Sequence, residues 1–276
     1  MGFFDTFWHK TLRRPYRLVV QDSGGNGKPL LLLHGLGQYG MRWEPLMELL
    51  STRKWRIIAP DLLGFGDSPK PAWNEYTVQE HTRMVLAELK RRKVKRPLTI
   101  VGHSMGCLVA AHLAATHPKR VKRLILYQPP LFVRDPAYRK HTRARGRYFA
   151  FYEYIASHPQ LAFLHHKMLW RIARRISGLH LSEQEWTPFA RSLRNTIMKQ
   201  ETYDELRDIA IPTDIVHGRL DMIVPRAEVR HMFAHNPYIT LYMVNDVHDV
   251  SPRAAKYIAK LLGSMIGSKY KQGEGL

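Results

Sequence analysis

The run Leu98-Thr-Ile-Val-Gly-His-Ser-Met-Gly-Cys-Leu-Val-Ala places Ser104 between two glycines, Gly102 and Gly106. An apolar strand pattern precedes this G-x-S-x-G motif and an apolar helix pattern follows it. This context predicts a sharp strand-to-helix turn with strained backbone angles, where side chains at the two glycine positions would collide with neighbouring elements. The turn would bring the hydroxyl to the carboxyl end of a sheet and to the positive end of a helix. We therefore predict that Ser104 is a nucleophile.

Short apolar runs alternate with helical patterns along the chain, which predicts the α/β class: a mostly parallel central sheet flanked by helices. The predicted strands are Tyr16–Gln21, Leu30–Leu33, Arg56–Ala59, Leu98–Val101, Leu124–Tyr127, Asp214–Val216 and Thr240–Met243. The predicted flanking helices are Thr77–Arg92, Ser104–His117 and Ala254–Ile266. The run Leu30–Leu33 is continuously apolar, which favours a central strand buried on both faces.

The alternation stops after Pro130, and strand patterns return only near Ile211. Helical patterns fill the interval, near Tyr138–Ser157, Leu161–Ile176 and Ser182–Glu201. We expect a helical cap, inserted late in the sheet. The predicted domain organisation is an N-terminal amphipathic segment at 1–15, a core at 16–130 and 205–267, a cap at 131–204 and a flexible tail at 268–276.

Four further motifs follow the order of one known family. They are His34-Gly35-Leu36-Gly37 after a buried strand, Asp61-Leu62-Leu63-Gly64-Phe65-Gly66-Asp67-Ser68, the turn from His217 to Pro225 that contains Asp221, and Val247-His248-Asp249 after the last strand. Together with the serine motif, they resemble the α/β-hydrolase fold superfamily, and in particular its serine-nucleophile esterases and carbon–carbon bond hydrolases. The resemblance covers the sheet domain and not the cap.

The resemblance implies a catalytic triad with Ser104 as nucleophile, His248 as general base and Asp221 as the acid that orients the histidine. It also implies an oxyanion hole made by the backbone N–H groups of Leu36 and Met105. In the family the turn from Asp61 to Ser68 is structural, so neither of these two residues is predicted to be catalytic.

Other residues could take the roles of acid and base. Many family members have a glycine directly before the histidine, where this chain has Val247. His248 is favoured over His103 and His235 by its position after the last strand. Asp246 and Asp249 are alternatives to Asp221, which is favoured because its motif and its terminal proline both fit.

The predicted chemistry follows from elementary acid–base behaviour. A serine hydroxyl is a weak nucleophile until a base removes its proton, and an imidazole with an ordinary pKa near 6.5 can accept and return that proton. We expect attack on an acyl carbon, formation of an acyl-enzyme and hydrolysis by water. No metal and no organic cofactor are needed for this cycle.

The net charge of +20 and the single cysteine, Cys107, restrict the classes of partner and compartment. One cysteine excludes an intrachain disulfide and a cysteine-based zinc site. No apolar run approaches a membrane span, and the N-terminus does not resemble a secretory signal, so we expect a cytoplasmic protein. The basic surface would attract anions, but no nucleic-acid-binding motif is present, so nucleic acid is not an expected partner.

Two segments suggest peripheral contact with an anionic membrane. A stripe formed by Phe3, Phe4, Phe7, Trp8, Thr11 and Leu12 would lie on one face of an N-terminal helix, with basic residues off that face. The cap also has six basic residues between positions 134 and 147, followed by aromatic side chains. Packing of the stripe on its own domain and an ordinary solvated basic helix face are the alternatives.

The function predicted from these patterns is a serine hydrolase that cleaves small-molecule carboxylic esters with an apolar acyl group, with a lipid-like or an anionic molecule as the substrate. The first alternative is a carbon–carbon bond hydrolase that acts on a diketone-like acid, because such enzymes share the triad and a helical cap. The second alternative is a non-catalytic, ligand-binding protein with the same fold. The acyl chain length and the oligomeric state do not follow from the sequence.

Overall fold

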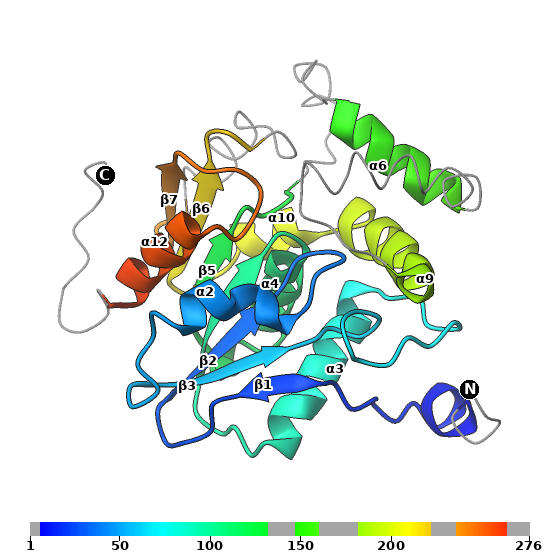
Figure 1. The fold of residues 1–276 in the computed structure, drawn as a ribbon, viewed down its shortest axis with the longest axis horizontal. Helices are drawn as coiled ribbons and strands as arrows, with labels where there is room; N and C mark the ends of the chain where they lie inside the picture. Colours follow the sequence, from blue (N-terminus) through cyan, green and yellow to red (C-terminus); the bar gives the residue numbers. More distant parts are fainter. Residues whose placement is uncertain (1–5, 132–146, 160–181, 222–235, 264–276) are drawn as a thin grey trace.

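The computed structural model of the 276-residue chain describes residues 6–131, 147–159, 182–221 and 236–263. Within them, seven strands form one sheet in the order β1-β3-β2-β4-β5-β6-β7 (Figure 1). The strands are β1 (Val20–Asp22), β2 (Lys28–Leu33), β3 (Trp55–Pro60), β4 (Leu98–His103), β5 (Val121–Tyr127), β6 (Thr213–Gly218) and β7 (Ile239–Val244). All neighbouring strands run parallel except β1 and β3. The predicted α/β class is confirmed.

The first strand is shorter than predicted and lies later in the chain. β1 pairs antiparallel with β3 over three residues, in the register Val20↔Pro60, and the segment before it makes no ladder. Tyr16 and Leu18 are nevertheless buried, which explains the apolar alternation that predicted a strand there. Their side chains pack under the sheet edge, while the backbone of Val19 bonds to the turn that follows β3.

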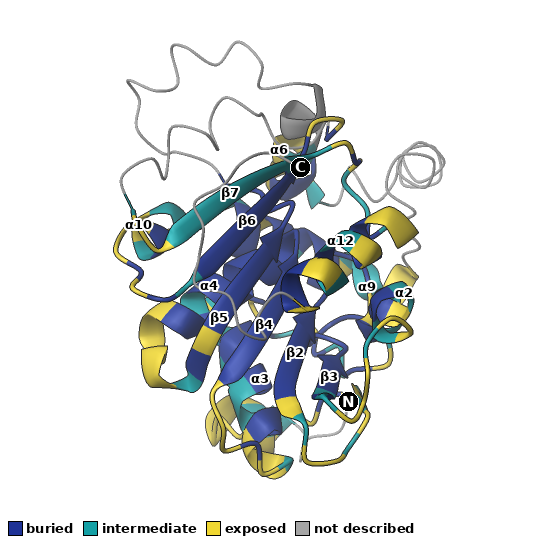
Figure 2. Ribbon diagram, turned by 90° about the vertical axis from the view of Figure 1, so that its left-hand side faces the viewer, coloured by how far each residue is buried: buried dark blue, intermediate teal, exposed yellow. Residues whose placement is uncertain are grey.

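Helices cover both faces of the sheet (Figures 1 and 2). Outside the cap, the described helices are η1 (Phe7–Thr11), η2 (Gly40–Trp43), α2 (Glu44–Met47), α3 (Val78–Arg91), α4 (Met105–Thr116), η3 (Pro118–Arg120), α10 (Thr202–Arg207) and α12 (Pro252–Gly263). The start of α3 agrees with prediction because Thr77 and Glu80 form a reciprocal capping box. Pro118 follows the end of α4, as predicted.

The strand Leu30–Leu33 shows how one apolar run builds two cores. Leu31 and Leu33 belong to the cluster that includes α3 and α4, whereas Leu30 and Leu32 belong to the cluster that includes α2 and α12. All four side chains are fully buried, because successive residues of a strand point to opposite faces. Figure 2 shows the central strands buried along most of their length, while the edge strand β7 is only partly covered.

The described part of the cap contains α6 (Arg147–Ser157), α9 (Glu183–Ser192) and η4 (Leu193–Met198). The predicted helix Ser182–Glu201 begins as expected, at a capping box formed by Ser182 and Glu185. It changes to a π-helix after Ser192, where the hydroxyl of Thr196 donates to the carbonyl of Tyr76 at 2.7 Å. The later part of the first predicted cap helix is α6, which ends at Ser157 as predicted. Residues 138–146 of that prediction, the predicted helix Leu161–Ile176 and the tail lie outside the described residues.

Among the residues that the structure describes, no helix has the length and apolar character that crossing a membrane requires.

Four histidines of the described residues are buried: His34 after β2, His81 in α3, His103 at the end of β4 and His217 in β6. Burial lowers the pKa of His34 to about 4 and the pKa values of His81 and His103 to about 3. His81 connects the core to the cap, because its Nε2 lies 3.2 Å from Oγ of Ser192 in α9. The imidazoles of His34, His81 and His103 are therefore neutral in the folded protein at neutral pH.

These buried imidazoles should make the fold sensitive to acid. A histidine in the unfolded chain has a pKa near 6.5. Below that pH the unfolded chain binds protons that the buried imidazoles do not bind. The free energy of unfolding therefore falls as the pH is lowered, until the pKa of the folded state is reached. Each of these three imidazoles should make the free energy of unfolding about 2 kcal/mol lower at about pH 5 than at about pH 7.5. His81→Asn should reduce the pH-dependent difference in unfolding free energy by about that amount, as measured by urea titration at both pH values. An unreduced difference in the variant would contradict a neutral buried His81.

Candidate active site

Ser104 lies in a strained turn between β4 and α4. Its backbone angles are φ 50° and ψ −122°, a conformation that side-chain-bearing residues rarely adopt. A Cβ added at Gly102 would lie 2.7 Å from the carbonyl oxygen of Gly106, and one at Gly106 would lie 2.3 Å from the carbonyl oxygen of Leu33. The geometry thus agrees with the predicted reason for both glycines. The turn holds the serine at the carboxyl end of the sheet, as the N-cap of α4.

The imidazole of His248 connects two side chains that are far apart in the sequence. Its Nδ1 lies 2.8 Å from Oδ2 of Asp221, and its Nε2 lies 2.9 Å from Oγ of Ser104. A carboxylate can only accept, so Nδ1 carries the proton and Nε2 is free to accept from the serine hydroxyl. The side chain of Asp221 is fully buried and that of His248 is 11% exposed. The three residues predicted from sequence therefore lie in one hydrogen-bonded row.

The alternative acids have other partners. Asp249 forms an ion pair with Arg42 and also lies near Nε2 of Gln38. Asp246 accepts from the backbone N–H of Val247 at 2.9 Å and from the hydroxyl of Ser251 at 2.8 Å. Both carboxylates thus hold the loop that carries the histidine, and the geometry favours Asp221 as the partner of the imidazole.

The alternative bases are less suited by position. Nε2 of His103 lies 3.0 Å from the carbonyl oxygen of His248, and its Nδ1 lies 3.0 Å from Oε1 of Gln38. His103 therefore contacts the backbone of the histidine loop, and the serine hydroxyl bonds to His248. His235 lies outside the described residues.

The turn from His34 to Gly37 lies against the serine. A Cβ on Gly35 would approach Cβ of Ser104 to 3.1 Å. Nδ1 of His34 donates to the carbonyl of Gly35 at 2.8 Å, and its Nε2 accepts from the N–H of Leu62 at 2.8 Å, which fixes the neutral tautomer and the turn. The turn therefore brings the backbone of Leu36 toward the start of α4, where Met105 is the first helical residue. The first N–H groups of a helix have no partner within it, which leaves the N–H of Met105 free of intrahelical bonds.

The turn from Asp61 to Ser68 is held by its own hydrogen bonds. The carboxylate of Asp61 accepts from the N–H groups of Gly40 at 2.6 Å and Asp67 at 2.8 Å, and the hydroxyl of Ser68 donates to the carbonyl of Asp61 at 2.6 Å. Both side chains are thus engaged in holding loops, in agreement with a structural role.

Several supporting residues were not found by sequence reasoning. Gln38, Arg42 and Gln128 contact the loop that carries His248. Gln128 offered one signal, because it is a polar residue directly after a buried strand, at the sheet edge where α/β sites form. Arg42 and Gln38 lie outside every motif that was singled out.

Cys107 lies one turn into α4 behind the serine. It is fully buried, its S–H donates to the carbonyls of Gly102 and Tyr127, and burial raises the pKa of its thiol. Cys107 therefore packs as a small, buried side chain.

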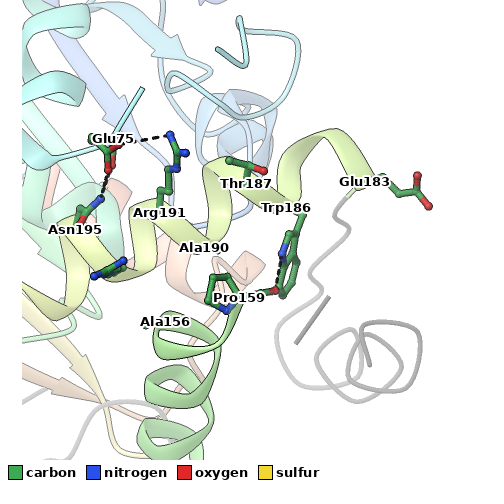
Figure 3. Close-up of a pocket in the computed structure, with 10 residues that line it drawn as sticks. Glu75, Ala156, Pro159, Glu183, Trp186, Thr187, Ala190, Arg191 and Asn195 are labelled. Atoms are coloured by element: carbon green, nitrogen blue, oxygen red, sulfur yellow. Dashed lines mark hydrogen bonds and ion pairs between the residues drawn. The ribbon is translucent and has the colours of Figure 1, made fainter. Parts of the chain in front are cut away.

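A hollow of about 790 Å³ opens between α6 and α9 in the cap (Figure 3). It is lined by Glu75, Ala156, Pro159, Glu183, Trp186, Thr187, Ala190, Arg191, Arg194 and Asn195. Arg191 lies 3.7 Å from the carboxylate of Glu75, and Asn195 donates to the carbonyl of the same residue at 2.7 Å (Figure 3). No triad residue lines the hollow, so it is a feature of the cap and its junction with the core.

Comparison with known proteins agrees with this geometry. The family model described as the alpha/beta hydrolase fold matches residues 28–247, and the chain belongs to this family. A solved thermophilic esterase from Thermogutta terrifontis has a similar fold, with a TM-score of 0.65 and 21% identity over 90% of this chain and 92% of that one. A meta-cleavage product hydrolase from Pseudomonas fluorescens IP01 also has a similar fold, with a TM-score of 0.65 and 18% identity over 90% and 93% of the two chains.

Curated relatives are similar at the level of sequence. The Arabidopsis thaliana protein named "Probable lysophospholipase BODYGUARD 3" is 29% identical over 80% of this chain and 52% of its own length. The pimeloyl-[acyl-carrier protein] methyl ester esterase of Aeromonas hydrophila subsp. hydrophila is 28% identical over 76% of this chain and 84% of its own length. The chain thus spans about half the length of the first of these relatives.

The tight approach of Gly106 to β2 gives a direct test of the serine turn. Gly106→Ala would put a methyl group 2.3 Å from the carbonyl oxygen of Leu33 and 2.7 Å from that of His34. Backbone atoms cannot move aside cheaply, so we expect a loss of more than about 2 kcal/mol in a urea titration. The matched control is Gly263→Ala at the end of α12, where an added Cβ meets no atom within 4 Å. This control should be neutral or stabilising by up to about 1 kcal/mol. Equal stability of Gly106→Ala and wild type would contradict the contact.

Proposed function

We propose that the chain is a serine hydrolase that cleaves carboxylic esters with an apolar, lipid-like acyl group through an acyl-enzyme. The observation that carries this proposal is the position of the His248 imidazole, 2.9 Å from the hydroxyl of Ser104 and 2.8 Å from the carboxylate of Asp221. A base that is oriented by a buried carboxylate and faces a strained serine is the arrangement that activates a hydroxyl nucleophile.

The proposed cycle uses only groups of this chain and water. Oγ of Ser104 attacks the ester carbonyl carbon while its proton passes to Nε2 of His248. The oxyanion of the tetrahedral intermediate accepts hydrogen bonds from the backbone N–H groups of Leu36 and Met105. The intermediate collapses as the imidazolium gives its proton to the leaving alkoxide, and the alcohol departs.

The second half of the proposed cycle restores the serine. His248 removes a proton from a water molecule, which attacks the acyl carbon of the acyl-enzyme. The second tetrahedral intermediate expels Oγ of Ser104, which takes the proton back from the imidazolium, and the carboxylic acid is released. Asp221 stays ionised throughout and stabilises each imidazolium.

The choice of ester is supported by the curated relatives. One is named a lysophospholipase and another a methyl ester esterase, and both names denote hydrolases of carboxylic esters. The likeness to the meta-cleavage product hydrolase is one of fold alone, at 18% identity. Ester cleavage is therefore the reaction that we propose.

Ser104→Ala should lower turnover of p-nitrophenyl esters by at least about a thousandfold, because it removes the nucleophile. It should also abolish labelling by a fluorophosphonate probe, while circular dichroism shows an unchanged fold. The matched control is Ser192→Ala, a buried serine in α9 whose hydroxyl contacts His81. This control should keep both activities.

The same experiment separates the competing functions. Wild-type protein that fails to react with the probe would contradict the enzymatic proposal and favour a non-catalytic ligand-binding protein. Labelling without turnover across a panel of acyl chain lengths would contradict ester cleavage and favour a carbon–carbon bond hydrolase. Rising turnover with longer acyl chains supports an apolar acyl site.

We also propose that the N-terminal region contacts an anionic membrane. Three apolar side chains at η1 are about half exposed: Phe7 at 46%, Trp8 at 52% and Leu12 at 46%. Lys10, Arg13, Arg14 and Arg17 are exposed nearby, and no acidic residue occurs between positions 6 and 21. Apolar side chains with surrounding basic residues suit a surface of anionic lipid, where both the acyl region and the headgroups find partners.

The triple variant F7S/W8S/L12S should bind vesicles that contain phosphatidylserine at least about tenfold more weakly, because it loses the apolar contact. Vesicle sedimentation measures the binding. Leu49→Ser, at a similarly exposed apolar position after α2, is the control and should bind like wild type. Unchanged binding by the triple variant, or equal wild-type binding to neutral vesicles, would contradict the proposal.

A further inference from the structure

Gln128 is a buried polar residue at the carboxyl end of the sheet. It directly follows β5, is fully buried, and has a positive φ of 54°. Glutamine seldom adopts this left-handed conformation, so surrounding contacts must hold it there. One of them is its own backbone N–H, which donates to the carbonyl of Val216 in β6 at 2.8 Å.

The side-chain amide of Gln128 bonds to two different loops. Its Oε1 accepts from the backbone N–H of Gly218 at 2.8 Å, and its Nε2 donates to the backbone carbonyl of Val247 at 2.7 Å. A backbone N–H can only donate and a carbonyl can only accept, so these two partners fix which end of the amide is which. Both ends of the buried amide are therefore satisfied.

The two bonded loops are those that carry the acid and the base. Gly218 begins the turn of Asp221, whose own N–H donates to the carbonyl of Gly218 at 3.2 Å. Val247 is the residue directly before His248. One side-chain amide therefore connects the loop of Asp221 to the loop of His248.

The packing around this amide leaves no slack. A Cβ on Gly218 would lie 2.3 Å from Nε2 of Gln128 and 2.3 Å from the carbonyl oxygen of Asp246. The glycine in the acid turn is thus required by the presence of the amide and of the histidine loop. The far side of the histidine loop is held by the ion pair of Asp249 with Arg42 and by the Tyr127 hydroxyl, which lies 3.2 Å from the carbonyl oxygen of Asp249 and 3.5 Å from that of Val247.

We propose that Gln128 is a positioning residue that sets the separation of the Asp221 and His248 loops, and so the alignment of the imidazole with Ser104. This proposal rests on the proposed serine hydrolase function. Gln128 touches no reacting atom and acts through the backbone of the two loops. Without it, the N–H of Gly218 loses its side-chain partner, the carbonyl of Val247 keeps only the longer contact of 3.5 Å with the Tyr127 hydroxyl, and the imidazole loses one of its constraints.

The first test replaces the amide by an apolar side chain of similar length. Gln128→Met should lower kcat for p-nitrophenyl esters and the rate of fluorophosphonate labelling by about 10- to 100-fold, while KM changes by less than about threefold. The matched control is Gln200→Met. Gln200 is also buried and donates to two carbonyls, those of Pro130 and Ile197, but it contacts neither triad loop. This control should keep kcat and the labelling rate within about twofold of wild type, even if its melting temperature falls by as much as that of Gln128→Met.

The second test gives a pH signature that a merely structural role would not produce. In Gln128→Glu, the carboxylate can still accept from Gly218 but repels the carbonyl of Val247, whereas the protonated acid can donate to it. Burial favours the protonated form, so it should be populated at accessible pH. The ratio of kcat/KM for this variant to that of wild type should rise by at least about fivefold between about pH 8 and about pH 5.5.

The outcomes distinguish this proposal from the function on which it rests. Folded Gln128→Met that labels and turns over like wild type would overturn the positioning role, as would an equal loss in Gln200→Met. Where Gln128→Met fails to fold, the glutamate variant decides, and a flat ratio across pH overturns the proposal. Failure of the wild-type protein to label would instead overturn the serine hydrolase function.

Discussion

The close approach of α4 to the end of β2 is the constraint on which the site depends. Only hydrogen fits between Gly106 and the carbonyl oxygens of Leu33 and His34. Because the helix sits so near, the chain must turn sharply at Ser104, with φ at 50°, to pass from β4 into α4. The same approach brings the turn after β2 beside the serine. Backbone packing of one helix on one strand therefore positions both the serine hydroxyl and the turn predicted to bind the oxyanion.

The histidine loop, in contrast, depends on side chains from several elements. Gln128 and Tyr127 donate to its carbonyls from the end of β5, and Arg42 pairs with Asp249 from η2. Val250 packs in the core at the end of this loop, and the hydrogen bonds hold the rest of it in a partly buried setting, where each bond is stronger than in water. The site thus combines a rigid nucleophile with a base whose place is determined by polar contacts.

The sequence was sufficient to predict the sheet and the grouping of Ser104, Asp221 and His248, because both leave local patterns. Leu30–Leu33 is apolar at every position, because its side chains alternate between the two cores on opposite faces of the sheet. The serine motif is local, because its two glycines are required by close backbone contacts within the turn itself and with the neighbouring strand. The extent of β1 was misjudged because Tyr16 and Leu18 are buried without a ladder, and apolar alternation reports burial rather than pairing. The change of α9 into η4 depends on a long-range bond from Thr196 to Tyr76, which leaves no periodic signal. The contacts of Gln128 and Arg42 with the histidine loop were not predicted either, because they also join residues that are far apart in the sequence.

The burial of Cys107 has a practical consequence for chemical labelling of the protein. A thiol with a raised pKa and no contact with solvent offers almost no thiolate to an electrophile, even though it lies one helical turn behind the serine. Maleimides and iodoacetamides should therefore not react with Cys107 in the native protein. A cysteine introduced on an exposed helix would then be the single reactive thiol in the described part of the molecule, so a spin label or fluorophore could be placed there without first removing the native residue.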